Sequence, residues 1–403
     1  MLDTTALAQA EFPLAGWASA TKRSALQQML SEASRPGILS FALGLPAAEL
    51  FPTDAFARSV AHVLANDARA LQYGPPYQPL KAHVVALMAQ RGVVCREENV
   101  FLTAGAQQGL SLLTRLLLEP GGRVLVEEMT YTGFQQVLEP FQPEILTVPT
   151  DLDTGIDVDA VERLLARGTQ PALIYTVTEG HNPLGVSMSQ AKRARLAALA
   201  REYRVPVIED DPYGFIHYGD SPNMPLRAYD EQWVLYIGSF SKILAPALRV
   251  GWLIVPEELI PKLSIIKESS DIDTNTLSQR AITNYLDGHH LPAHLTRLLQ
   301  EYRVRRDAML GALAEHFPPG ARWQQPASGL FVWVELPGEV DTGELLRAAL
   351  ETERVAFIPG QAFSVGQHRR GKNCLRLNFS HSSVERIKDG VERLARVLKG
   401  LYP

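Results

Sequence analysis

The stretch Trp233-Val234-Leu235-Tyr236-Ile237-Gly238-Ser239-Phe240-Ser241-Lys242 joins an apolar run to two hydroxyls and an amine. Its five apolar residues at the start predict a buried strand. Lys242 then follows the end of that strand, and Arg249 comes seven residues later. The stretch therefore predicts an amine at a strand end, with a fixed cation close behind it.

An amine in this setting suits a particular chemistry. Partial desolvation, or a second cation nearby, lowers the pKa of a lysine and yields a nucleophile. Such an amine forms a Schiff base with an aldehyde, and the hydroxyls of Ser239 and Ser241 together with Arg249 suit a phosphate on the same molecule. Pyridoxal phosphate is therefore the first cofactor to test. For the tetrapeptide alone, an exposed lysine at a strand end stays an alternative.

The composition is that of an ordinary globular protein. The chain has 403 residues, 46% of them hydrophobic and 21% charged, and this length exceeds that of most single cores, so two domains are expected. A net charge of -5 gives no electrostatic case for nucleic acid or acidic membranes. No run reaches the roughly 18 apolar residues of a membrane span, and no charged-then-apolar leader is visible. With only Cys95 and Cys374 as thiols, a cytoplasmic protein is expected.

Short apolar runs alternate with helix-period segments between about residues 98 and 256. The runs that predict strands are Arg123 to Glu127, Ala172 to Val177, Val205 to Glu209, Trp233 to Ile237 and Val250 to Val255. Between two of them a helical repeat follows Ser189, a suitable N-cap. The alternation is typical of an α/β fold, with a mostly parallel sheet flanked by helices.

The pattern changes after about residue 290. A long amphipathic helix begins at Pro292 and ends before Pro318-Pro319-Gly320. Beyond it, strands are predicted at Leu330 to Leu336, Val355 to Ile358 and Leu375 to Phe379, with a helix after the first and the last. We therefore predict an N-terminal arm (residues 1–45) that packs on a small domain, a large domain (46–290) and a small C-terminal α+β domain (291–403).

Polar residues gather where the predicted strands end, which is where doubly wound sheets bind ligands. Thr103-Ala104-Gly105-Ala106-Gln107-Gln108-Gly109 opens a helix whose free amides and positive dipole suit a phosphate. Asn182 follows one predicted strand, and Asp210 with Tyr213 follows the next. A buried carboxylate needs a positive partner, which a protonated pyridine nitrogen provides. Taken singly, the Thr103–Gly109 motif is also explained as a plain helix N-terminus, and Asn182 before a proline as a turn former.

In this order, the motifs resemble those of the fold-type I aminotransferases, in particular the class I/II branch with the 2-aminoadipate and kynurenine aminotransferases. The resemblance extends over nearly the whole chain. Further segments that carry it are Phe41-Ala42-Leu43-Gly44-Leu45-Pro46, Leu50-Phe51-Pro52, Leu71-Gln72-Tyr73-Gly74-Pro75 and Arg376-Leu377-Asn378-Phe379-Ser380. It implies a pyridoxal phosphate-dependent enzyme that moves the α-amino group of an amino acid to a 2-oxo acid, with ping-pong kinetics.

The resemblance implies a role for each residue around the cofactor ring. Lys242 would form the internal aldimine and afterwards carry the proton between the substrate carbon and the cofactor carbon. Asp210 would keep the pyridine nitrogen protonated, so that the ring takes up electrons. Tyr213 and Asn182 would hydrogen-bond the phenolic oxygen, and Tyr131 would stack on the ring.

The resemblance also implies how phosphate and substrate are bound. The phosphate ligands would be the amides of Ala106 and Gln107, the hydroxyls of Ser239 and Ser241, and the guanidinium of Arg249. Tyr73 would reach the same phosphate from a neighbouring subunit, which implies a homodimer with shared active sites. Arg376 would bind the substrate α-carboxylate through two parallel hydrogen bonds, and the backbone at Gly44 would approach the substrate.

Several residues depart from the pattern of this family. His181 and Leu184 replace the usual glutamine and threonine around Asn182, and Leu43 replaces the first glycine of a Gly-Gly pair. Gln27 stands where the 2-aminoadipate branch has an arginine for the distal carboxylate of its substrate. We therefore expect amino acid substrates with neutral or apolar side chains.

Other functions stay open. A β-lyase, a decarboxylase or a racemase would use the same Lys242, Asp210 and Arg376. A ligand-sensing domain of a transcription regulator would need a helix-turn-helix, for which the first ~45 residues leave no room. A nicotinamide dehydrogenase would need a G-x-G-x-x-G motif after a strand, and none follows any predicted strand.

No metal site is predicted. His289, His290 and His294 are close in sequence, but Pro292 starts a helix between them and no carboxylate or cysteine shares their spacing. A loop at the domain junction explains these histidines better.

Overall fold

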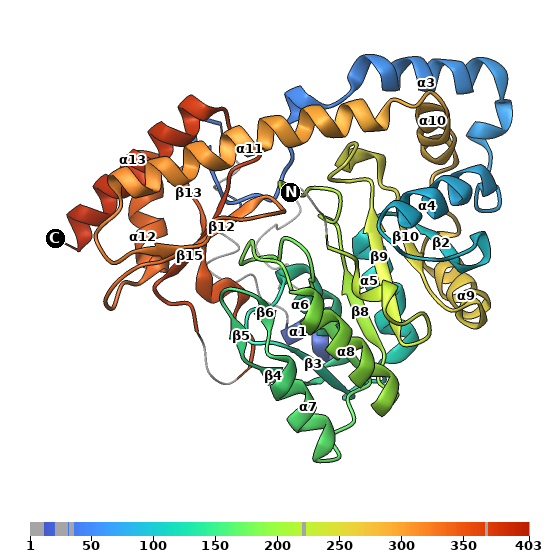
Figure 1. Ribbon diagram of the computed structural model, residues 1–403, viewed down its shortest axis with the longest axis horizontal. Coiled ribbons are helices and arrows are strands. Elements are labelled where there is room, and N and C mark those ends of the chain that lie inside the picture. Colours follow the sequence, from blue (N-terminus) through green and yellow to red (C-terminus); the bar gives the residue numbers. More distant parts are fainter. Residues whose placement is uncertain (1–11, 21–30, 32–35, 220–222, 367–369, 403) are drawn as a thin grey trace, which may run out of the picture.

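The computed structural model describes residues 12–20, 31, 36–219, 223–366 and 370–402. Its central sheet consists of β2 (Val100–Thr103), β3 (Arg123–Glu127), β4 (Glu144–Val148), β7 (Leu173–Thr176), β8 (Val207–Asp210), β9 (Val234–Ser239) and β10 (Gly251–Ile254). The strand order is β2-β10-β9-β8-β7-β3-β4 (Figure 1). Only β10 runs antiparallel to its neighbours. The predicted α/β fold with a mostly parallel sheet is confirmed.

Helices cover both faces of this sheet. One face carries α5 (Ala106–Leu117), α6 (Thr132–Leu138) and α9 (Ile260–Asp271), and the other carries α7 (Val158–Ala166) and α8 (Gln190–Tyr203). Side chains alternate along β7, so Leu173 and Tyr175 enter the core of the first face and Ile174 that of the second. The Ser189 hydroxyl accepts a hydrogen bond from the Lys192 amide, which starts α8 as predicted.

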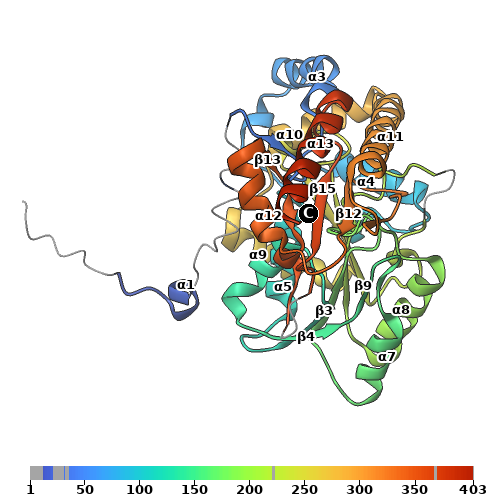
Figure 2. The same ribbon diagram turned by 90° about the vertical axis from the view of Figure 1, so that its left-hand side faces the viewer.

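Three further helices pack together beside the sheet: α3 (Thr53–Asn66), α4 (Gln78–Gln90) and α10 (Thr276–Asp287) (Figure 1). A short hairpin, β5 (Thr150–Asp151) and β6 (Gly155–Ile156), follows β4. Figure 2 shows α1 (Gly16–Ala20) to one side of the layered body.

The C-terminal part forms a second, antiparallel sheet. Its strands, in spatial order, are β11 (Arg322–Trp323), β12 (Phe331–Glu335), β15 (Cys374–Asn378) and β14 (Ile358–Pro359). The helices α11 (Leu291–His316), α12 (Thr342–Ala348) and α13 (Val384–Leu401) share one core with them. Within the described residues, no helix has both the length and the apolar character that crossing a membrane demands.

The predicted strand Val355 to Ile358 is wrong as a single element. Val355 and Ala356 form β13, which pairs in parallel with β1 (Leu39–Ser40), whereas Ile358 and Pro359 form β14 and pair with β15. The chain therefore passes from one sheet to another at Phe357, and β1, from the predicted arm, lies against the C-terminal part. The three-part domain division stays a prediction, and Gln27 lies outside the described residues.

Candidate active site

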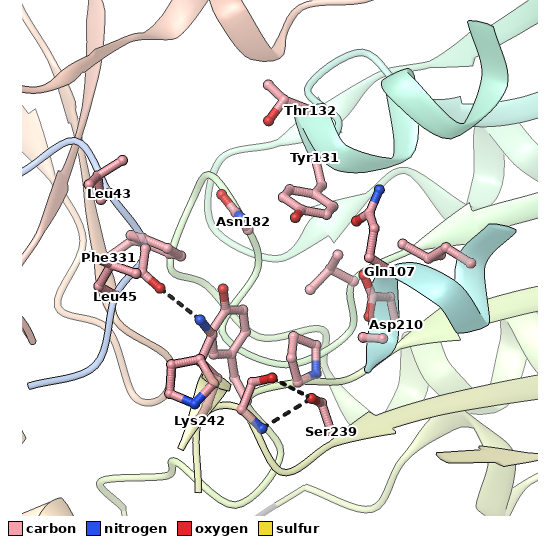
Figure 3. Close-up of a pocket in the computed structure, with 18 of the residues that line it drawn as sticks. Leu43, Leu45, Gln107, Tyr131, Thr132, Asn182, Asp210, Ser239, Lys242 and Phe331 are labelled. Atoms are coloured by element: carbon pink, nitrogen blue, oxygen red, sulfur yellow. Dashed lines mark hydrogen bonds between the residues drawn. The ribbon is translucent and has the colours of Figure 1, made fainter. Parts of the chain in front are cut away.

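A cavity of about 540 Å³ gathers side chains from both sheets (Figure 3). The predicted site residues that line it are Gly44, Ala106, Gln107, Tyr131, Asn182, Asp210, Tyr213, Ser239, Ser241, Lys242, Arg249 and Arg376. Tyr73 is the predicted residue that the chain does not bring there: it is 74% exposed and lines a different pocket, with Asp273 and Ile272. The cavity therefore collects the predicted constellation except for the residue expected from a second subunit.

Lys242 follows β9 and points into the cavity. Its Nζ donates a hydrogen bond to the Gly44 carbonyl at 2.7 Å, which joins the end of a central strand to the N-terminal part of the chain (Figure 3). Burial lowers the pKa of Lys242 to about 8, and the positive charges of Arg376 and Arg249 act in the same direction. The unprotonated fraction of this amine near neutral pH is therefore larger than that of an ordinary lysine.

Asp210 ends β8 on the opposite side of the cavity, and it is 3% exposed. Its Oδ2 accepts a hydrogen bond from the Tyr175 hydroxyl at 2.9 Å, while Oδ1 has no hydrogen-bond partner within the described residues. Burial raises the pKa of Asp210 to about 7; the Tyr175 hydrogen bond opposes this shift, and the neighbouring charge of Asp211 adds to it. A buried carboxylate with an unsatisfied oxygen needs a cation or a donor from a ligand.

Arg376 lies on β15 and is almost completely buried. Its Nη1 and Nη2 donate to the Asn182 Oδ1 and the Ala42 carbonyl, both at 2.6 Å, whereas its buried Nε finds no partner in the described chain. The rings of Phe331 and Phe363 lie 4.1 and 5.0 Å from the guanidinium carbon. The planar fork is thus held in place at the cavity wall, where it suits a carboxylate.

A cradle for an anion forms at the N-terminus of α5. Gly105, its N-cap, has a φ of 90° and provides no side-chain cap. A Cβ added to Gly105 would lie 2.5 Å from the Arg249 Nη2, which donates to the Ala104 carbonyl at 2.9 Å. The Ser239 hydroxyl accepts from the Ser241 amide at 3.1 Å. Helix amides, two hydroxyls and a guanidinium therefore meet at one place, as phosphate binding requires.

The sequence missed several residues that line the cavity or support its lining. The Tyr175 hydroxyl donates a hydrogen bond to Asp210. In the sequence Tyr175 is one of several core residues of its strand, and only the position of that strand beside β8 reveals its role. Gly133 makes room for Tyr131, because a Cβ there would lie 2.4 Å from the ring. Neither Tyr175 nor Gly133 lines the cavity itself; the unpredicted residues that do are Ala42, Leu45, Leu110, Thr132, Gln136, Val177, Pro212, Pro246, Phe331 and Ile358. Most are apolar and carry no local signal that distinguishes them from the core.

Leu43, His181 and Leu184, the departures that the structure describes, occupy two different places. Leu43 lines the cavity, opposite Thr132 (Figure 3). The side chains of His181 and Glu127 are both 3% exposed, with Nε2 3.2 Å from Oε2. The Leu184 amide donates to His181 Nδ1 at 3.4 Å, while the Leu184 side chain lines a separate pocket. His181 therefore holds the loop that carries Asn182 without facing the cavity.

Comparisons with known proteins agree with this geometry. A family model for class I and II aminotransferases matches residues 45–394. The aromatic-amino-acid aminotransferase 1 of Thermococcus litoralis is 38% identical over 387 residues, covering 94% of this chain and 92% of its own. The 2-aminoadipate transaminase of Thermus thermophilus is 38% identical over 385 residues, covering 94% of each chain. The crystal structure of the kynurenine aminotransferase of Pyrococcus horikoshii has a TM-score of 0.91 and 35% identity, and the match covers 97% of this chain and 98% of that one. The chain therefore belongs to the class I and II aminotransferases and is a pyridoxal phosphate-dependent transferase of fold type I.

Proposed function

We propose that this aminotransferase binds pyridoxal phosphate in the 540 Å³ cavity, with Lys242 as the point of covalent attachment, and acts on amino acids with neutral or apolar side chains. The observation that carries the proposal is the unsatisfied, buried Oδ1 of Asp210 across the cavity from the Lys242 amine. A protonated pyridine nitrogen would give that oxygen the cationic donor it lacks.

When bound, pyridoxal phosphate supplies an aldehyde for amino groups and a ring that takes up the electron pair left when a Cα–H bond breaks. Lys242, with its lowered pKa, accepts the Cα proton and returns it, since an amine whose pKa lies close to the working pH serves as both base and acid. The Gly44 carbonyl orients that amine. Burial raises the pKa of Tyr213, so its hydroxyl stays protonated and, with Asn182, would hold the cofactor's phenolic oxygen by a hydrogen bond. Tyr131 would pack against the ring.

Arg376 binds the α-carboxylate of the substrate. Its Nε is free to donate, and its Nη groups are held by Asn182 and Ala42, so the guanidinium needs no rearrangement before a substrate binds. Each Nη group carries a second N–H besides the one that it donates to Asn182 or Ala42, so the fork can still donate two parallel hydrogen bonds to the carboxylate.

The character of the cavity wall supports the substrate class. Leu43, Leu45 and Ile358 line it, and among its lining residues the cations are Lys242, Arg249 and Arg376, each of which already has a role. A second carboxylate on the substrate would therefore face apolar side chains, at a desolvation cost. The aromatic-amino-acid aminotransferase named above, 38% identical, is a relative whose name agrees with this class.

A homodimer with shared active sites is the assembly that we propose. Tyr73 is exposed and outside its own cavity, and Leu71 and Ile272, 74% and 60% exposed, add apolar surface that a second copy would cover. We also propose a location in the cytoplasm; two free cysteines are consistent with its reducing environment.

Spectroscopy and a donor screen test the proposal. The purified protein with pyridoxal phosphate should be yellow, and borohydride should attach the cofactor irreversibly to Lys242, as mass spectrometry of peptides will show. Leucine, methionine and phenylalanine with 2-oxoglutarate or pyruvate should then convert the coloured form to pyridoxamine phosphate, and 2-aminoadipate should do so less well. A colourless protein without an adduct at Lys242 contradicts the cofactor site, and a preference for 2-aminoadipate contradicts the substrate class.

A further inference from the structure

A hydrogen-bonded cluster lies on the outer side of the turn that forms the phosphate cradle. It joins Gln108, in the first turn of α5, to Lys267 and Asp271, in the last turns of α9. Gln108 Oε1 accepts from Lys267 Nζ at 3.0 Å, and Gln108 Nε2 donates to Asp271 Oδ2 at 2.6 Å. Lys267 Nζ also donates to Asp271 Oδ1 at 2.7 Å, which closes the ring of contacts. None of the three residues lines the cavity.

The cluster acts on one residue of the cradle, Ala104, through the peptide units on either side of it. The Ala104 amide donates to Gln108 Oε1 at 2.8 Å, and the Ala104 carbonyl accepts from Arg249 Nη2. Ala104 is thus held from both sides, by a residue of the cluster and by a residue of the cradle. The next residue, Gly105, has a φ of 90° and no Cβ to restrict it. Hydrogen bonds therefore fix the direction of the following amides, those of Ala106 and Gln107: the bonds to Ala104 and the one that the Thr103 hydroxyl donates to the Gly105 carbonyl at 3.1 Å.

The charges of the cluster fix which end of the Gln108 amide faces the turn. With the side chain as described, its oxygen faces two donors and its nitrogen faces a carboxylate. If the amide turned over, its NH₂ group would face the Ala104 amide and the Lys267 ammonium, and its oxygen would face the Asp271 carboxylate. All three hydrogen bonds of the Gln108 side chain would then be lost. Lys267 is 6% exposed, so its ammonium is placed in the interior, where only paired charges are tolerated.

We propose that Gln108, Lys267 and Asp271 are positioning residues for the cofactor phosphate. They orient the Ala104–Gly105 turn so that the first amides of α5 and the Arg249 guanidinium bind the phosphate together. The inference rests on the proposed function, since the phosphate is that of pyridoxal phosphate. It assigns the cluster an effect on the phosphate group alone, not on the ring or on the covalent bond to Lys242.

The test compares pyridoxal phosphate with pyridoxal, which differ only in the phosphate. Full-length protein stripped of cofactor is titrated with each compound, and the absorbance of the lysine adduct gives both dissociation constants. Gln108→Leu should raise the dissociation constant for pyridoxal phosphate about three- to tenfold, the effect of about one hydrogen bond, and change that for pyridoxal less than about twofold. The double variant Lys267→Met/Asp271→Leu, which leaves no unpaired charge, should act in the same direction. Lys262→Met, an exposed lysine on the same helix, should change neither constant.

Two results overturn the inference. If both compounds bind more weakly by the same factor, the cluster only supports the fold, and if neither constant changes, the turn keeps its orientation without the cluster. Failure of the proposed function looks different, because then the unsubstituted protein binds neither compound at Lys242.

Discussion

At the residue scale, the proposed function implies that the protonation state of Asp210 depends on whether the cofactor is bound. Its pKa, about 7 in the folded protein against an ordinary 3.8, is raised mainly by burial. Between these two pH values the folded, cofactor-free protein holds a proton that the unfolded chain has released. The stability that this proton contributes is fully present below pH 3.8 and is lost as the pH rises toward 7, at up to about 1.4 kcal/mol per pH unit.

We predict that the cofactor stabilises the folded protein by an amount that depends on pH. A protonated pyridine nitrogen keeps Asp210 ionised, so pyridoxal phosphate should stabilise the protein more at pH 8 than at pH 5. Thermal unfolding with and without cofactor measures the gain at each pH. Asp210→Asn serves as the control, because Glu209 and Asp211, whose pKa values burial also raises, stay in place. The same pH dependence in Asp210→Asn would assign it to those neighbours instead.

Leu43 lines the cavity, so we expect it to limit the size of the substrate side chain that the cavity admits. Leu43→Ala removes apolar bulk from the wall opposite Thr132. We expect kcat/KM for tryptophan to rise about tenfold relative to that for leucine, since a few methylene groups in a pocket are worth about 1–3 kcal/mol. Leu64→Ala, on the exposed side of α3, is the control and should leave the ratio unchanged. An unchanged ratio in Leu43→Ala would place the substrate side chain elsewhere.

At the scale of elements, His181 links two strands through the loop after β7. Its Nδ1 accepts from the Leu184 amide, its Nε2 lies 3.2 Å from Oε2 of Glu127 on β3, and the Glu127 Oε1 accepts from Thr176 at 2.8 Å. The loop positions Asn182, which in turn contacts Arg376. A substitution of His181 should therefore weaken substrate binding, although His181 itself does not contact the substrate.

His181→Ala should raise KM for the amino donor about tenfold, with a smaller effect on kcat, because Arg376 loses a positioned partner. It should also lower the free energy of unfolding by about 3 kcal/mol, since Glu127 is left buried without its partner. His181→Gln keeps a donor for Glu127 and should behave nearly as the unsubstituted enzyme. Steady-state kinetics and urea unfolding measure both effects. Equal losses in His181→Gln and His181→Ala would contradict the role assigned to the pair.

The elements differ in how far sequence alone predicts them. Strands such as β8 and β9 lie within two residues of their predicted bounds, because each is a compact apolar run followed by polar residues that end it. The order of Asn182, Asp210 and Lys242 at strand ends likewise predicted which residues share the cavity. The break at Phe357 was not predictable, since it depends on pairing with β1, more than 300 residues earlier. Tyr175 escaped for the same reason, because its partner lies on a neighbouring strand.

At the scale of the whole molecule, we expect one edge of the chain to contact a second copy. Asp273 Oδ2 accepts from the Gly74 amide at 3.1 Å, and this fixes the loop of Tyr73 against the end of α9. Tyr73 and Ile272 line a pocket of about 560 Å³ at this edge, outside the cavity of Lys242. In an isologous dimer each copy presents the same edge to the other, so each cavity can receive the tyrosine of its partner.

Mixed dimers test this arrangement. Tyr73→Ala and Lys242→Ala should each abolish most activity alone, but in a mixed dimer the chain with Lys242 intact receives an intact Tyr73 from its partner. An equal mixture, unfolded and refolded together, contains one half mixed dimers with one complete site each, so about a quarter of the unsubstituted activity should return. The control mixes Tyr73→Ala with the double variant Tyr73→Ala/Lys242→Ala, in which no complete site can form. No recovery in the first mixture, in spite of mixed dimers detected by native mass spectrometry, would show that Tyr73 serves its own chain or no active site.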